Sequence, residues 1–234
     1  MALSHDDLWP RAGSWPAFAA GDDADAVLLG VPTWRTSLSP TGAHATPAAI
    51  REALTRYSAA LMGPPVVDLT EALRVLDAGD VAEPDGEDGI AATVARVREL
   101  ADATRLVIAL GGDNALTYPV ARGARATGLI TIDAHFDLRD GISNGSPVRR
   151  LIEDAPEGER IDPTRIVQIG IADFANSAAY AARAADWGIR VITLDEVRRR
   201  GIAEVIAEAT RIAGAGAGAP VSYTHLTLPT ILLV

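Results

Sequence analysis

Three residues with metal-binding side chains alternate in the stretch TIDAHFDLRD, residues 131–140: Asp133, His135 and Asp137. Side chains at i, i+2 and i+4 of an extended chain point to one face, so these three converge if extended geometry persists beyond the strand end. Two carboxylates and an imidazole suit Mn, Zn, Fe or Mg, in that order. The string is equally typical of a polar loop in which His135 is hydrogen-bonded to a neighbouring carboxylate.

The stretch GGDN, residues 111–114, follows an apolar run that we expect to be a buried strand. Its two glycines permit close backbone approach, and Asp113 or Asn114 could either cap the next helix or bind a metal. Neither G-x-G-x-x-G nor G-x-x-x-x-G-K-[ST] occurs in the chain, so GGDN is not typical of a phosphate loop. A nucleotide-binding α/β domain is therefore disfavoured.

A turn-rich loop with two arginines, SNGSPVRR, occupies residues 143–150. Arg149 or Arg150 could clamp a substrate carboxylate through two parallel hydrogen bonds. The alternative, favoured for either residue by itself, is a solvated helix start in which the arginine pairs with Glu153 or Asp154.

The composition excludes several classes of protein. The 234 residues include 21 Lys+Arg against 31 Asp+Glu, a formal charge of −10, which repels a nucleic acid backbone or an anionic membrane surface. No cysteine is present, so thiolate metal sites and cysteine nucleophiles are excluded. The acidic N-terminal stretch lacks the features of a secretory signal, and no run approaches the roughly 18 apolar residues of a membrane span. We expect a cytoplasmic protein.

The elements that must position these residues alternate between strands and helices. Thr46 as N-cap and Pro47 at the first helical position predict a helix after a long loop at 33–45. The alternation predicts a mostly parallel sheet with helices on both faces and a site at the carboxyl ends of the strands. We expect one domain, residues 1–220, followed by a distinct tail at 221–234. The expected strands are 23–32, 105–113, 128–135, 165–173 and 190–197, and the expected helices are 46–61, 86–104, 177–189 and 195–214.

Taken in order, these motifs resemble the ureohydrolase family of arginase, agmatinase and formimidoylglutamase. The resemblance spans roughly residues 24–220 and rests on LGVP, GAHATPAAIREAL, GGDN, DAHFDLRD, SNGSPVRR and QIGIAD. It implies a three-layer α/β/α fold that lacks the family's last strands. It also implies hydrolysis of a linear C–N bond in an amidine or guanidine by two manganese ions, which activate water for attack on the carbon.

The resemblance also implies roles for single residues. Asp133 corresponds to a carboxylate that bridges the two metals, His135 to a ligand of one metal and Asp137 to a ligand of the other. Asn114 stands where the family has a histidine ligand, so the metal shared by Asp137 should bind less tightly. Asn144 replaces a histidine of S-H-G-x-P that is a candidate proton shuttle.

The same resemblance indicates a substrate. The loop residues Asn144, Ser146 and Arg149 are the expected substrate contacts, and no catalytic residue is assigned. GGDNALTYP, SNGSPVRR and QIGIADFANS are most similar to formimidoylglutamases, which convert N-formimidoyl-glutamate to glutamate and formamide. An agmatinase or arginase type of hydrolase, or a catalytically silent binding protein of this family, is the alternative.

The end of the chain departs from the family pattern. No aspartate follows Asp195, although the family has two in a later S-x-D-x-D strand. The stretch VSYTHLTLPT resembles the translation of a transposase adapter used in preparing sequencing libraries, so we expect the natural sequence to be interrupted near Pro220 and His225 to carry no function. We expect the chain as written to express poorly and bind metal weakly, and the full-length protein to form homo-oligomers.

Overall fold

The computed structural model describes residues 6–215 and the backbone of residues 220–224. The chain divides into two compact units, which we describe separately. Unit 1 comprises Met1–Arg35 and Thr41–Asp113, and unit 2 comprises Thr36–Pro40 and Asn114–Val234. No helix among the described residues is long and apolar enough to cross a membrane.

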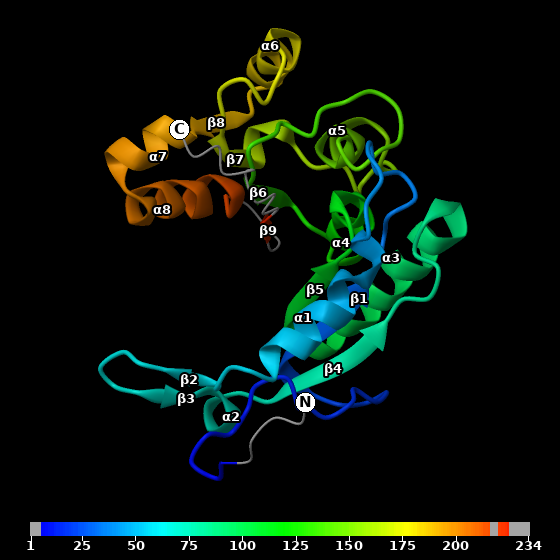
Figure 1. The fold of residues 1–234 in the computed structure, drawn as a ribbon. Coiled ribbons are helices and arrows are strands. Elements are labelled where there is room, and N and C mark those ends of the chain that lie inside the picture. The colour runs from blue at the N-terminus through cyan, green and yellow to red at the C-terminus, as the bar shows by residue number, and fades with distance from the viewer. Residues whose placement is uncertain (1–5, 216–219, 225–234) are drawn as a thin grey trace. The chain divides into compact units, whose positions relative to one another are not determined.

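Unit 1 is built on a parallel sheet of three strands in the order β4-β1-β5 (Figure 1). Helices α1 and α3 both pack against β1 and β5. A short antiparallel pair, β2 and β3, lies outside this sheet. The elements are β1 (Ala24–Val31), η1 (Ala43–Ala45), α1 (Thr46–Leu54), β2 (Ala60–Leu61), β3 (Val67–Asp68), α2 (Leu69–Ala72), β4 (Val75–Asp80), α3 (Gly86–Ala103) and β5 (Thr104–Gly111).

Unit 2 is built on a parallel sheet of four strands in the order β8-β7-β6-β9. Its elements are η2 (Asn114–Leu116), α4 (Thr117–Gly123), β6 (Gly128–Ile132), α5 (Pro147–Glu153), η3 (Pro163–Arg165), β7 (Ile166–Ile171), α6 (Ala178–Asp186), β8 (Arg190–Thr193), α7 (Leu194–Arg200), α8 (Ile202–Ala213) and β9 (Pro220–Thr224). The α/β class with parallel sheets is as predicted. Strand β9 includes residues 221–224 of the expected tail, whereas residues 225–234, including His225, lie outside the described residues.

Helix α8 covers one face of the sheet in unit 2. Its residues Val205, Ala209 and Ala213 recur every four positions and are fully buried. They pack on inward-facing strand residues, and Gly128 lets the helix end approach β6, because a Cβ there would lie 2.1 Å from the Ala213 carbonyl oxygen. The strand residues of this core are Ile130, Val167, Ile169 and Ile192.

Two predicted helices have different bounds in the structure. The helix expected at 46–61 ends at Leu54, because neighbouring groups bind the backbone beyond it: Thr55 O accepts from Arg11, and Tyr57 O accepts from Ala12 N. The helix expected at 195–214 is two helices, since Gly201 has a φ of +84° and separates α7 from α8.

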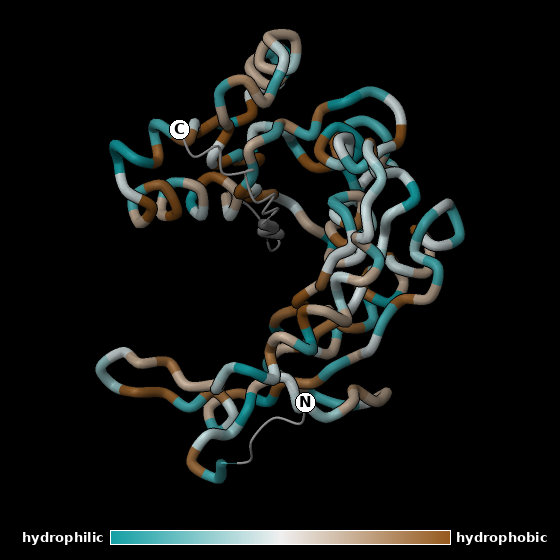
Figure 2. Tube along the Cα trace, in the orientation of Figure 1, coloured by the Kyte–Doolittle hydropathy of each residue, from teal (hydrophilic) through white to brown (hydrophobic). Residues whose placement is uncertain are grey.

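Strand β5 differs from β1 in its exposure. β1 is almost wholly buried, whereas Leu106 and Ile108 of β5 are 53% and 39% exposed. Figure 2 shows β5 among the hydrophobic segments of the chain. Within the described residues β5 pairs only with β1, so its other edge has no strand partner.

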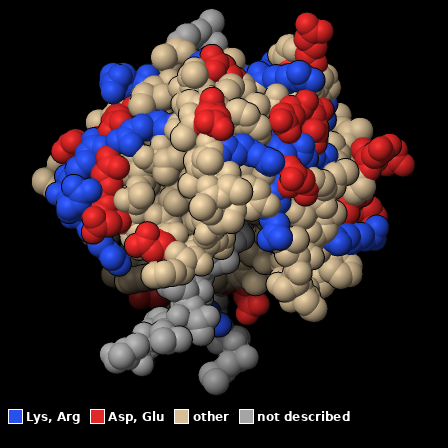
Figure 3. Space-filling model, turned by 90° about the horizontal axis from the view of Figure 1, so that it is seen from above, with Lys and Arg blue, Asp and Glu red and all other residues tan. Residues whose placement is uncertain are grey.

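An arginine–carboxylate network joins β8, α7 and α8. All 21 basic residues of the chain are arginine, and they are interspersed with carboxylates on the face shown in Figure 3. Arg190 donates to Glu208 (2.7 Å) and Glu196 (2.6 Å), and Arg200 pairs with both of these carboxylates. Hydrogen bonds from Arg190 and Arg200 lower the pKa of Glu208 from 4.5 to about 2.

This network predicts a pH-dependent stability. Because the pKa of Glu208 is lower in the folded than in the unfolded state, its contribution is complete above about pH 4.5 and is lost as the pH falls toward about 2. Glu208→Gln should lower the thermal midpoint at pH 7 and lower it much less near pH 2.5. Glu204→Gln, which removes an exposed partner of Arg200 on the same helix, should have little effect at either pH. Equal losses at both pH values for Glu208→Gln would contradict this account.

Candidate metal centre

The three candidate ligands of the DAHFD motif lie in a loop and not in a strand. Strand β6 ends at Ile132, and residues 133–137, hereafter the ligand loop, follow it without regular structure. Asp137 has a φ of +53°, in the left-handed region that L-residues rarely adopt. The extended geometry that would align the side chains by alternation therefore does not continue past the strand.

Asp133 and His135 form one pair in the ligand loop. Asp133 is 4% exposed, and its Oδ1 accepts from His135 N at 2.9 Å and lies 3.2 Å from His135 Nδ1. Its second oxygen, Oδ2, is buried without a hydrogen-bond partner among the described residues. The His135 side chain is 46% exposed. A buried carboxylate oxygen without a partner costs free energy, and a bound cation would compensate it.

Asn114 and Asp137 form a second pair, and both are buried. Asn114 Nδ2 donates to Asp137 Oδ2 at 2.7 Å, and Asn114 Oδ1 accepts from Thr117 Oγ1 at 2.8 Å. Among the described residues, no three His, Cys, Asp or Glu side chains form a group that could hold a metal ion. The structure thus brings the four candidate ligands together as two pairs.

The glycines of GGDN serve a close approach within unit 1. A Cβ on Gly112 would lie 2.3 Å from Thr33 N, so only glycine fits there. The backbone N–H of Asp113 donates to Thr33 O, and Thr33 Oγ1 donates back to Asp113 O. These bonds fix the end of β5 against the end of β1.

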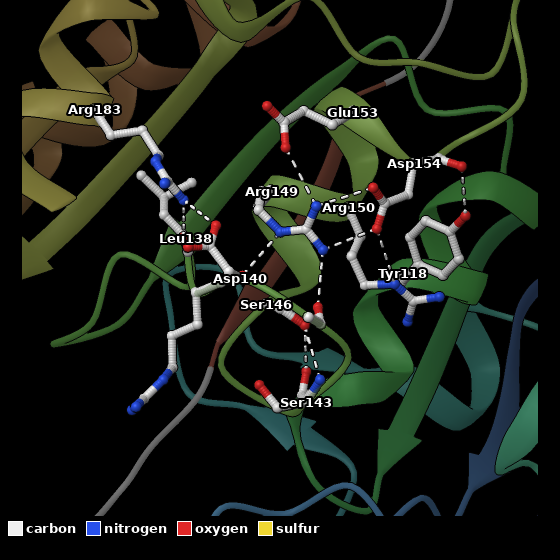
Figure 4. Close-up of polar contacts among 12 residues, drawn as sticks. Tyr118, Leu138, Asp140, Ser143, Ser146, Arg149, Arg150, Glu153, Asp154 and Arg183 are labelled. Carbon is white, nitrogen blue, oxygen red and sulfur yellow. Dashed lines mark hydrogen bonds and ion pairs between the residues drawn. The ribbon is translucent and has the colours of Figure 1, made fainter.

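The SNGS loop is held by its own serines (Figure 4). Ser146 is fully buried, and its Oγ donates to Ser143 O at 2.8 Å and accepts from Ser143 N at 2.9 Å. Asn144 Oδ1 accepts from Leu38 N at 3.2 Å. The prediction that Asn144 and Ser146 contact substrate stays a prediction, and Ser146 has a structural role in this loop.

Arg149 is bound entirely within unit 2. Its guanidinium donates five hydrogen bonds, to Arg139 O, Gly141 O, Glu153 and both oxygens of Asp154 (Figure 4). The hydrogen bonds that Arg149 donates to Asp154, and the one to Glu153, raise the pKa of its guanidinium. All its donors are therefore used in the structure, as in the alternative weighed from the sequence, and its substrate contact stays a prediction.

Arg150 is buried beside Tyr118. Its guanidinium carbon lies 3.8 Å from the centre of the Tyr118 ring, and its Nε forms an ion pair with Asp154 Oδ2 at 3.7 Å, a distance too long for a hydrogen bond (Figure 4). Burial lowers the pKa of Arg150. A buried position under an aromatic ring does not suit contact with a diffusing substrate.

Arg139 is a residue that the motif reading missed. Its backbone is fixed at both ends, because its N–H donates to Gly145 O and its carbonyl accepts from Arg149. Its side chain lies against Gly145 and is exposed, without a hydrogen bond or ion pair to any described residue. The sequence feature that could have indicated Arg139 is its place two residues after Asp137 in DAHFDLRD.

Comparisons with known proteins identify the family of this chain. The model of the arginase family matches residues 24–228, so the chain belongs to the arginase family. Formimidoylglutamase of Bacillus subtilis is 34% identical over 194 residues, which are 78% of this chain and 59% of that protein. Guanidinopropionase of Pseudomonas aeruginosa is 32% identical over 212 residues, 86% of this chain and 65% of that protein. The chain thus spans less than two thirds of the length of these relatives.

Solved structures of the family share the fold. The crystal structure of formimidoylglutamase from Bacillus subtilis matches with a TM-score of 0.83 at 26% identity, over 95% of this chain and 72% of that one. Trypanosoma cruzi formiminoglutamase with two Mn²⁺ matches with a TM-score of 0.75 at 27% identity, over 88% of this chain and 72% of that one. The predicted family and the arginase-like fold are both confirmed.

The Asn114–Asp137 pair predicts a gain of metal affinity on substitution. An amide is a weak ligand and here donates a hydrogen bond to Asp137, whereas a neutral imidazole offers a nitrogen lone pair. Asn114→His should tighten Mn²⁺ binding by about tenfold or more, measured by the free Mn²⁺ signal in electron paramagnetic resonance. Asp133→Asn, which keeps the shape of the side chain, should abolish binding in either background. Unchanged affinity in Asn114→His would contradict the pairing of residue 114 with a metal.

Proposed function

We propose that this protein is a metal-dependent hydrolase of linear C–N bonds in amidines or guanidines, acting on an acidic substrate of the formimidoyl-glutamate kind. The observation that carries the proposal is the buried, unpaired Oδ2 of Asp133 beside His135, in a chain of the arginase family. Three curated formimidoylglutamases, 33–34% identical to the chain, support the substrate class.

The donor types suit a divalent metal, although the described side chains form two pairs and not one group of three. We propose that Asp133, His135 and Asp137 would hold the metal, with Asn114 as a weak fourth donor. A divalent metal supplies Lewis-acid chemistry: it lowers the pKa of water and stabilises the charge that develops on the substrate. We propose manganese, supported by the Mn²⁺ named with the solved Trypanosoma cruzi formiminoglutamase.

Arg139 gives the site its preference for an acidic substrate. Its guanidinium is exposed and not neutralised by any described side chain, and its main chain is held rigidly two residues from Asp137. A guanidinium binds a carboxylate through two parallel hydrogen bonds. The same charge repels a cationic substrate such as agmatine, which disfavours an agmatinase.

The place of strand β9 beside β6 suggests where the two further carboxylate ligands of the family would lie. It runs parallel to β6, and Thr224 pairs with Ile132, the residue before Asp133. The S-x-D-x-D strand of the family would, in this place, bring two more carboxylates to the ligand loop. That residues 221–234 are foreign to the natural protein remains a proposal, which the genomic sequence beyond codon 220 tests. Assembly into homo-oligomers likewise remains a prediction.

A panel of substrates tests the activity. The gene product, extended past residue 220 by its genomic sequence and loaded with Mn²⁺, should release formamide from N-formimidoyl-glutamate. It should release little urea from agmatine or arginine. The chain as given should be much less active, because it has no aspartate after Asp195. Absence of any product across the panel would favour a catalytically silent binding protein, for which the Asn114–Asp137 hydrogen bond is the motivating observation.

Arg139 should determine substrate affinity and not the rate of the chemical step. Arg139→Ala in the extended protein should raise KM for N-formimidoyl-glutamate by about tenfold or more with kcat little changed, since a charge-assisted hydrogen bond contributes about 1.5–3 kcal/mol. Arg165→Ala, which removes an arginine bonded to Thr127 and Ala213 O, is the control and should leave KM unchanged. An unchanged KM in Arg139→Ala would contradict the assignment.

A further inference from the structure

The ligand loop is fixed by side chains that come from far along the sequence. Phe136 lies between His135 and Asp137, and both of its backbone polar groups are bound by side-chain amides. Its N–H donates to Asn176 Oδ1 at 3.0 Å, and its carbonyl accepts from Gln168 Nε2 at 2.8 Å. The two amides lie 40 and 32 residues away, after β7 and within it.

Ala134, the other residue between candidate ligands, is bound in the same way. Its carbonyl accepts from Asn176 Nδ2 at 2.8 Å and from Ala172 N at 3.1 Å. Asn176 therefore binds the loop at two successive even-numbered positions. The candidate ligands are residues 133, 135 and 137, so both residues that separate them, Ala134 and Phe136, are held by β7 or by the segment that follows it.

The chain continues to be held on the far side of the ligand loop. Arg183 of α6 donates to Leu138 O at 2.8 Å and to Asp140 at 2.8 Å (Figure 4). Gln168 is fully buried, and Asn176 is half-buried, so water competes little for the bonds of Gln168. Because β6 ends at Ile132, the strand pairing of the described residues does not reach residues 134–136.

From these contacts we infer that Asn176 and Gln168 are positioning residues for the metal centre: they set the backbone of the ligand loop that carries Asp133, His135 and Asp137. The inference rests on the proposed function. In this role both residues act on the loop backbone, because Gln168 Nε2 and both polar atoms of the Asn176 amide bind Phe136 or Ala134. They act before binding, by lowering the conformational entropy that metal binding must otherwise remove.

Two measurements on the chain as it exists test the inference: deuterium exchange of the Phe136 amide without metal, and the affinity for Mn²⁺. In the wild-type chain without metal, the Phe136 amide should exchange slowly with deuterium, and Asn176→Ala should speed that exchange. Asn176→Ala and Gln168→Met, the latter close to Gln168 in shape, should each weaken Mn²⁺ binding by about tenfold, the usual size for partners that orient ligands.

The control is Ser177→Ala. Ser177 is adjacent to Asn176 and caps α6 by accepting from Tyr180 N, but it does not touch the ligand loop. It should destabilise α6 and leave both Phe136 exchange and Mn²⁺ affinity unchanged within twofold. If Asn176→Ala acted only by loosening the fold, it would behave as Ser177→Ala does and leave Phe136 exchange and Mn²⁺ affinity unchanged.

The outcomes separate the two claims. A wild-type chain that binds no Mn²⁺ at millimolar concentration overturns the proposed metal site, and the positioning role with it. A wild-type chain that binds Mn²⁺ while Asn176→Ala and Gln168→Met bind it equally well overturns the positioning role alone. Rapid deuterium exchange of the Phe136 amide in the metal-free wild-type chain would also overturn the positioning role alone.

Discussion

The buried carboxylate of Asp133 is the constraint on which the candidate site depends. One of its oxygens is occupied by the backbone and ring of His135, and the other is buried without a partner among the described residues. Removing a carboxylate from water is costly unless a cation or hydrogen-bond donors compensate it. Neighbouring segments of the same chain must therefore hold Asp133 in place at the end of β6, and the hydrogen bonds of Asn176 and Gln168 to the ligand loop do this.

The two parallel sheets explain why the polar residues gather where they do. In each unit a group of polar residues follows the carboxyl end of a largely apolar strand: GGDN follows β5, and DAHFD follows β6. Strand β5 retains exposed leucine and isoleucine side chains and a free edge within the described residues. An apolar strand of this kind is typical of a sheet interior.

Much of the fold could be predicted from the sequence, since β1 is a continuous apolar run and α3 carries apolar residues at helical spacing. The helix ends were less predictable: α1 stops at Leu54 because Arg11 and Ala12, distant in sequence, bind the backbone beyond it. The ligand types in DAHFD were apparent, but the contacts that orient them were not. Asn176 and Gln168 carry no local pattern that links them to residues 134–136. The pairing of Arg149 with Glu153 and Asp154 could be anticipated from their spacing, but its bonds to the Arg139 and Gly141 carbonyls could not.

The most direct test of the central claim is anomalous diffraction at the manganese edge from crystals of this chain grown with Mn²⁺. The account predicts a peak within coordination distance of Asp133 Oδ2 and a ring nitrogen of His135. A chain that diffracts well and shows no peak there, or shows manganese only at surface carboxylates away from the ligand loop, would contradict it.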